Sequence, residues 1–134
     1  MNDSLLMALS VAAYWLVLLS PILAAATFAA LRMQQGQPVL TPSLNLLGPA
    51  IPWMVFFTYA ALNQWEDVGH PREVDPMVGG VSLFVYCGTP VLAAVAVWRA
   101  KGYRWWALFV GVLNTVVGMA TAFLGIMMTS GNWI

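Results

Sequence analysis

Four long apolar stretches alternate with short polar segments along the chain. They cover residues 5–31, 42–65, 76–98 and 103–128. The hydrocarbon core of a bilayer is about 30 Å thick and is crossed by roughly 20 helical residues, so each stretch is long enough to span it. The pattern predicts an all-α integral membrane protein with one membrane domain over residues 1–134 and four transmembrane helices.

The first stretch is expected to remain in the protein as a span. A cleaved signal peptide begins with a positively charged segment and has an apolar region of about 7–15 residues. Residues 1–4 carry no Lys or Arg, and the apolar stretch that follows them is much longer.

Two of the stretches begin with a helix start signal. In Thr41-Pro42 and in Asp75-Pro76, a side chain that can cap a helix precedes a proline. Proline is favoured at the first helical position because its missing N–H would have no partner there. The Thr or Asp oxygen accepts a hydrogen bond from the free amides of the first turn. We therefore expect helices to start at these two places.

Other prolines lie inside the apolar stretches, where a proline removes a backbone hydrogen bond and kinks the helix. They predict kinks at Pro21, at Pro49/Pro52 and at Pro90. At Pro49/Pro52 two alternatives stay open: the helix bends through the prolines, or it breaks there. Cys87, just before the last kink, is expected to be buried as a small apolar side chain.

Tryptophans and amides mark the ends of the spans. Amphipathic tryptophan rings favour the headgroup region, and five of them lie near predicted ends: Trp65, Trp98, Trp105, Trp106 and Trp133. Trp53 fits this pattern only if the second span is broken, and Trp15 lies within its span, where we expect it to pack against another helix. Asn63 and Gln64 are expected to satisfy free carbonyl groups where the second span ends.

The composition excludes several classes of protein. Of the 134 residues, 61% are hydrophobic, 13% are aromatic and 7% are charged, and the net charge is zero. In a soluble domain about a quarter of all residues are charged, and a disordered chain is poor in aromatic residues. A nucleic-acid-binding surface requires a basic stripe. The sequence has none, so we expect no nucleic acid partner.

The basic residues lie mostly on one side of the predicted four-span fold. The loops after the first and third spans hold Arg32, Arg99, Lys101 and Arg104, whereas the opposite side has only Arg72. Lys and Arg accumulate in the cytoplasmic loops of membrane proteins. This asymmetry predicts that both termini and the middle loop face the outside of a plasma membrane, which we expect to be a bacterial inner membrane.

The predicted spans contain no Asp, Glu, Lys, Arg or His, and the only histidine is His70 in the middle loop. Ionisable residues inside spans usually mark proton relays and ion paths. A proton-coupled carrier, a haem held by two histidines and a nucleophile–base pair are therefore not expected from this chain alone. We expect no enzyme activity, no metal site and no cofactor of its own. Bound lipids are expected, and a pigment or quinone fits only at an interface shared with other subunits.

Two polar loops are candidate binding surfaces. The residues of the middle, outer loop are Glu66, Asp67, His70, Arg72, Glu73 and Asp75. We interpret them as a candidate docking surface for an outer partner. A solvated connector is the simpler alternative, and an oxygen-ligand cation site is a third. The inner basic loop, with Arg99, Lys101 and Arg104, fixes the topology or contacts anionic lipid headgroups.

Small and polar residues form a stripe along the fourth span. Its glycines recur every seven residues, and the other members lie three or four positions away, so all share one helix face. The stripe consists of Gly111, Asn114, Thr115, Gly118, Thr121, Ala122 and Gly125. Small residues let helices approach closely, and Asn or Thr can hydrogen-bond across the contact. The stripe predicts a helix-packing face, either within the chain or against another subunit. A wall of a lipid, pigment or quinone groove is the third alternative.

The leading hypothesis is a non-catalytic four-span subunit that packs through its helices within a larger membrane assembly, in a structural or accessory role. Spans without ionisable groups, the packing stripe and the small extramembrane mass favour it. A second hypothesis is a small oligomeric carrier or channel with Asn63, Gln64, Thr89 and Asn114 as polar contacts. A third is an immunity-type protein that binds a pore-forming toxin in the membrane.

The charge asymmetry generates a topology prediction. Cysteines introduced at Asn2 and Asn132 should react with a membrane-impermeant thiol reagent in intact cells, and a cysteine at Gln35 should not, because the loop around residue 35 is predicted to face the cytoplasm. Labelling of Gln35→Cys in intact cells would contradict the orientation.

Overall fold

The computed structural model describes residues 3–64, 66, 70 and 72–131, with side chains described from residue 8 onward. All regular elements in this part of the chain are helical. They are α1 (Asp3–Gln34), α2 (Leu40–Leu47), the 3-10 turn η1 (Gly48–Ala50), α3 (Ile51–Leu62), α4 (Pro76–Arg99) and α5 (Arg104–Ser130). Four segments are long and apolar enough to cross a membrane: Ala8–Gln34, Leu40–Leu62, Pro76–Arg99 and Arg104–Ser130. The prediction of an all-helical chain with four such helices is confirmed.

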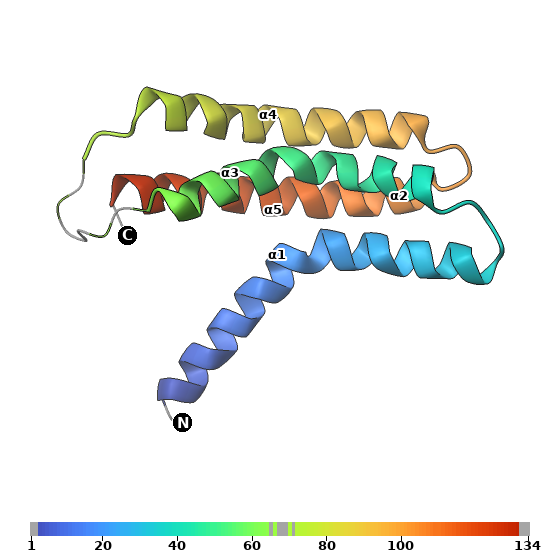
Figure 1. The fold of residues 1–134 in the computed structure, drawn as a ribbon, viewed down its shortest axis with the longest axis horizontal. Helices are drawn as coiled ribbons and strands as arrows, with labels where there is room; N and C mark the ends of the chain where they lie inside the picture. The colour runs from blue at the N-terminus through green and yellow to red at the C-terminus, as the bar shows by residue number, and fades with distance from the viewer. Residues whose placement is uncertain (1–2, 65, 67–69, 71, 132–134) are drawn as a thin grey trace.

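Helix α5 is the centre of the bundle, because it contacts α1, α2, η1, α3 and α4. Its most extensive contact is with α4, and these two helices run alongside the span formed by α2, η1 and α3 (Figure 1). The second half of α1 also lies along the bundle. Its first half points away from the other helices (Figure 1).

Side chains along α1 are exposed where the helix points away from the bundle and become buried where it joins the bundle. Every side chain from residue 8 to residue 17 is exposed, whereas Leu18, Ala25 and Phe28 are buried against the bundle. Trp15 is 48% exposed, and its ring lies edge-on to Tyr14 of the same helix, with 6.2 Å between the ring centroids. The expectation that Trp15 packs against another helix is therefore not met within this chain, where its side chain is half exposed and its ring contact is with Tyr14 of the same helix.

Helical backbone continues through the second span, and its two inner prolines lie in or just after one short 3-10 turn. The turn covers Gly48–Ala50, and the Ile51 amide donates to the carbonyl of Gly48. A 3-10 turn uses hydrogen bonds three residues apart, so the register of the backbone bonds changes where Pro49 and Pro52 supply no N–H. Helical backbone therefore continues through the prolines, with α2 and α3 joined by the 3-10 turn, and a kink at Pro49/Pro52 stays a prediction. The kinks predicted at Pro21 and Pro90, both inside continuous helices, stay predictions.

Helix starts follow the sequence signals at one site and not at the other. Asp75 caps α4, since its Oδ1 accepts a hydrogen bond of 2.8 Å from the Met77 amide, and this prediction is confirmed. The second span starts at Leu40 after Val39, which makes no side-chain cap. The predicted Thr41 cap is therefore wrong. Thr41 lies inside the first turn, where its backbone is already helical and a following proline is still tolerated.

Helices α3 and α5 end at a polar and a glycine cap residue, respectively. The Asn63 side-chain amide donates to the carbonyl of Tyr59 over 2.9 Å, which confirms the expected role of Asn63. Helix α5 ends at Gly131, whose φ of 69° lies in the left-handed region and whose amide donates to Met127. Glycine is favoured at such a position because a Cβ would be strained there.

Cys87 does not lie on the buried face of α4. Buried residues in this helix recur every three or four positions: Val78, Ser82, Val85, Thr89, Ala93 and Ala96. Cys87 falls between two of these positions and is therefore on the opposite side of the helix, where it is exposed. The expectation of a buried cysteine is wrong, because a small side chain in an apolar helix does not by itself identify the buried face.

Candidate functional site

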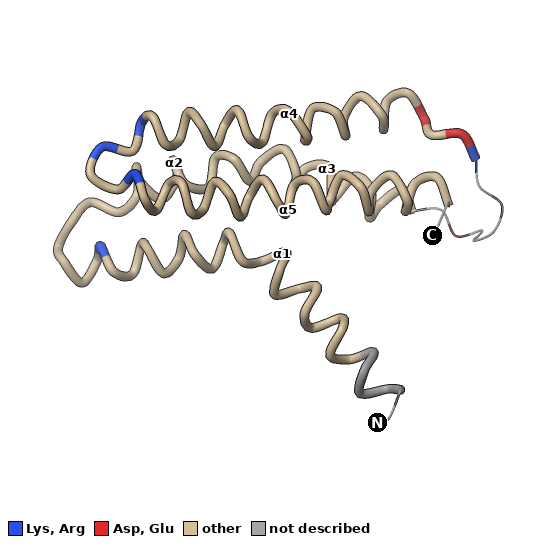
Figure 2. Tube along the Cα trace, turned by 180° about the vertical axis from the view of Figure 1, so that it is seen from behind, with Lys and Arg blue, Asp and Glu red and all other residues tan. Residues whose placement is uncertain are grey.

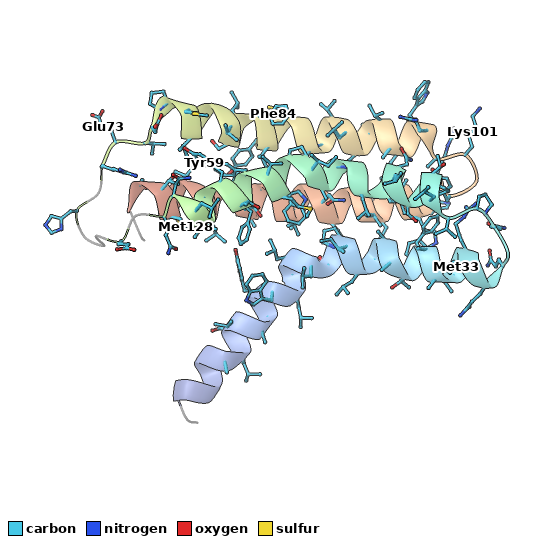
Figure 3. All side chains as sticks on the ribbon, in the orientation of Figure 1. Met33, Tyr59, Glu73, Phe84, Lys101 and Met128 are labelled. Atoms are coloured by element: carbon cyan, nitrogen blue, oxygen red, sulfur yellow. The ribbon has the colours of Figure 1, made fainter. Side chains whose placement is uncertain are left out.

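The charged residues separate to the two ends of the bundle. Arg32, Arg99, Lys101 and Arg104 lie at the end where α1 connects to α2 and α4 connects to α5 (Figure 2). The described acids of the middle loop lie at the other end together with Arg72 (Figure 2). Figure 3 shows the side chains of Glu73 and Lys101 at these opposite ends. We call them the acidic end and the basic end.

At the basic end, one arginine is held by its own chain and three cations are not. The Nε of Arg32 donates to the carbonyl of Pro38 over 2.9 Å. Its guanidinium lies 5.5 Å from the ring centroid of Phe28 and 5.6 Å from that of Tyr103, which is the geometry of a cation–π contact. The residues of the inner basic loop, Arg99, Lys101 and Arg104, are exposed. Among the described residues, no side-chain hydrogen bond or ion pair joins any of these three cations to another residue.

Arg72, the cation of the outer loop, is bonded to the end of α5. Its backbone amide donates to the carbonyl of Ser130 over 3.1 Å, and its Nε donates to the carbonyl of Thr129 over 3.2 Å. These carbonyls belong to the last turn of α5, where a cation also interacts favourably with the helix dipole. Arg72 is therefore anchored to the bundle, just before the start of α4.

The remaining candidates of the outer loop lie in different surroundings. Glu66, His70 and Glu73 are exposed, Asp75 caps α4, and Asp67 lies outside the described residues. Within the described part of the chain, no group of three or more His, Cys, Asp or Glu residues is placed to hold a metal ion.

The glycines of the α5 stripe face other helices of the same chain. A Cβ at Gly111 would lie 3.1 Å from the Cβ of Ala93, and a Cβ at Gly118 would lie 3.3 Å from the Oγ1 of Thr89, both on α4. At Gly125 the neighbour is α3, where a Cβ would lie 2.6 Å from the ring of Phe56. The glycines thus allow close approach of α5 to α3 and α4.

Most of the other stripe residues are buried in the same seam. Asn114, Thr121 and Ala122 are buried, whereas Thr115 is half-buried and donates to the carbonyl of Gly111 in its own helix. Gly111 and Thr115 also line a shallow apolar groove of about 300 Å³ between α4 and α5. One edge of the stripe therefore borders a groove, as the third alternative for the stripe requires.

A buried hydrogen bond joins the second span to α5. The indole Nε1 of Trp53 donates to the Oδ1 of Asn114 over 3.0 Å, and both side chains are at least 98% buried. The Nδ2 of Asn114 and the hydroxyls of Thr89 and Thr121 are also buried, without a partner among the described residues. Trp53 is therefore a structural residue of the bundle interior, although its sequence position suggested only a possible headgroup contact.

The residues named for a carrier path lie in two separate places. Asn63 and Gln64 follow the end of α3 at the acidic end, whereas Thr89 and Asn114 are buried between helices. Asn114 already has Trp53 as a partner. The pairing of Trp53 with Asn114 was not predicted, because 60 residues separate the two in the chain and neither belongs to a local motif. A buried Asn in a span is the one signal that could have prompted a search for its partner.

Comparison with family models, with curated proteins and with solved structures found no match for this chain. Its function is therefore inferred from its own residues.

The contacts of the glycine stripe generate a stability prediction. Gly125→Ala should lower the free energy of unfolding by about 1–3 kcal/mol, because the added methyl meets the fully buried ring of Phe56. The matched control is Gly80→Ala on α4, where an added Cβ meets nothing within 4 Å and alanine favours the helix. Unfolding in mixed detergent micelles with increasing dodecyl sulfate measures both. Equal stability of the two variants would contradict the close contact.

The buried hydrogen bond generates a second stability prediction. A double-mutant cycle with Trp53→Phe and Asn114→Leu should give a coupling energy of about 0.6 kcal/mol and no more than about 1.7 kcal/mol, the range measured between membrane helices. The control cycle replaces Trp53→Phe by Trp105→Phe, since Trp105 is 82% exposed, and should show no coupling. Additive effects in both cycles would mean that the bond contributes nothing to stability.

Proposed function

We propose that the protein is a non-catalytic four-span subunit that packs through its helices within a larger membrane assembly. The proposal places it in a plasma membrane, as in a bacterial inner membrane, with both termini outside. The exposure of every side chain from residue 8 to residue 17, in the first half of α1, is the observation that carries the proposal. Pro21 lies at the junction between this half and the packed half, and the proposal assigns the change of direction to this proline.

Polar atoms on the free half of α1 favour a protein partner over lipid alone. Tyr14 and Trp15 are 37% and 48% exposed, and neither the Tyr14 hydroxyl nor the Trp15 indole N–H has a hydrogen-bond partner among the described residues. In the hydrocarbon core, lipid tails offer no acceptor, and a polar group without a partner is costly there. A helix of another subunit can supply both apolar contacts and acceptors.

The charged ends support the orientation and a second contact surface. Four of the five Lys and Arg residues lie at the basic end, which the positive-inside rule assigns to the cytoplasm. At the acidic end, Arg72 is bonded to the last turn of α5, and Glu66 and Glu73 are exposed. A residue next to an anchored position, as Glu73 is next to Arg72, loses less conformational freedom on binding, which favours docking of an outer partner.

The assembly is tested by site-specific cross-linking in native membranes. A photo-reactive amino acid replaces Trp15 in one variant and Phe84 in the matched control, where Phe84 is 60% exposed on α4. We expect a discrete cross-linked band of higher mass from position 15 and none from position 84, because only the free half of α1 is proposed to contact a partner. Mass spectrometry of the band identifies the partner.

Two results would contradict the proposal. One is the absence of a protein cross-link from position 15 in native membranes. The other is the same pattern of bands from both positions, which would indicate random collisions between neighbouring proteins.

A further inference from the structure

A groove at the basic end has apolar walls and a polar rim. It lies between the second span and α4 and has a volume of about 420 Å³. Leu44, Leu92 and Val95 form the apolar part and are 61%, 37% and 43% exposed, so this part is open to the surrounding hydrocarbon. Gly48 widens it, since a Cβ there would meet nothing within 4 Å.

The polar rim is built around the side chain of Asn45. Its Nδ2 donates to the carbonyl of Ala96 over 2.9 Å and to the hydroxyl of Tyr103 over 3.2 Å. The Ala96 carbonyl lies in the last turn of α4, where the Ala100 amide bonds to Val97 and carbonyls need other donors. Because the Tyr103 oxygen accepts from Asn45, its own hydrogen remains able to donate.

The position of Tyr103 is fixed from its other side. Its ring lies 5.4 Å from the ring of Phe28 and 5.6 Å from the guanidinium of Arg32, measured to the ring centroids. The hydroxyl donor at the rim is therefore held in place before any ligand arrives. Such preorganisation lowers the entropy lost on binding.

The charge at the rim is positive and without a counter-ion in the described structure. Arg99 lines the groove, and it has no acid near it, because the described acids lie at the acidic end (Figure 2). An arginine guanidinium binds phosphate through charge-assisted hydrogen bonds. A ligand that matches this groove has a phosphate next to a long apolar chain.

We infer that the groove binds an anionic phospholipid. The phosphate lies against Arg99 and the Tyr103 hydroxyl, and one acyl chain runs along Leu44, Leu92 and Val95. This goes beyond the proposed function, because the site is complete within one chain and needs no partner subunit. The ligand is a membrane lipid and not a free phosphate, because the apolar part of the groove opens toward the hydrocarbon.

The lipid preference is tested first on the unmodified protein. The probes are dioleoyl phosphatidylglycerol, dioleoyl phosphatidylcholine and glycerol phosphate, added to the purified protein in a neutral detergent, with native mass spectrometry as the readout. We expect phosphatidylglycerol to bind about tenfold more tightly than phosphatidylcholine, because both lipids carry the phosphate and only phosphatidylcholine adds a positive charge beside Arg99, where like charges repel. Equal binding of the two lipids, or binding of glycerol phosphate as tight as that of phosphatidylglycerol, would overturn the inference.

The role of Arg99 is tested against a neighbouring cation. Arg99→Gln should weaken phosphatidylglycerol binding about tenfold. Lys101→Gln removes the same charge from the same end but does not line the groove, and should weaken binding no more than about twofold, as for an exposed charge. Equal losses would mean that the lipid follows the general charge of the basic end, which would overturn a defined site.

The groove itself is tested with a bulky side chain. Gly48→Leu fills the apolar part and should reduce the number of bound phosphatidylglycerol molecules by one. The control is Ala94→Leu, which adds similar bulk to the other groove, between α4 and α5, and should leave the number unchanged. The same number of bound lipids in Gly48→Leu as in the unmodified protein would overturn the placement of the chain.

Discussion

The fold depends on how closely α5 approaches its neighbours. Between helices in lipid there is no hydrophobic driving force of the kind that acts in water, so association relies on close packing and on hydrogen bonds. Gly125 lies directly over the ring of Phe56, which is fully buried, and Gly118 lies over Thr89. Because α5 contacts every other helix of the bundle, a larger side chain in this seam would displace more than one neighbour.

The hydrogen bond between Trp53 and Asn114 adds specificity to this packing. Phe56 lies about one turn after Trp53 on α3, so the ring contact at Gly125 and the indole contact at Asn114 together fix how α3 is placed along α5. A shift of one helix along the other would leave the side-chain Oδ1 of Asn114 buried and without its donor. The cost of such an unpaired polar group disfavours alternative packings, even where the net contribution of the bond is small.

The sequence predicted four helices long and apolar enough to span a membrane and the Asp75 cap, and it singled out the small residues of α5, because each of these depends on local chemistry. Length and apolarity define a span, and small residues differ visibly from their bulky neighbours. It did not predict the exposure of Cys87 or of Trp15, because a helix that is apolar all round carries little signal about which face is buried. The Trp53–Asn114 pair and the bridge made by Asn45 join distant parts of the chain, and no local pattern encodes them.

Arg72 and Arg32 make side-chain hydrogen bonds within the chain, whereas the side chain of Arg99 makes none with the described residues. This difference determines which cation can bind a ligand. Arg72 is held by the carbonyls that end α5, and Arg32 by Pro38 and two rings, so both contribute to the fold. Arg99 is left to act on a ligand at the basic end. The free half is the N-terminal half of α1, which points away from the bundle (Figure 1) and therefore away from the groove at the basic end. A subunit on α1 and a lipid at Arg99 can therefore bind at the same time, and a variant that loses one contact should keep the other.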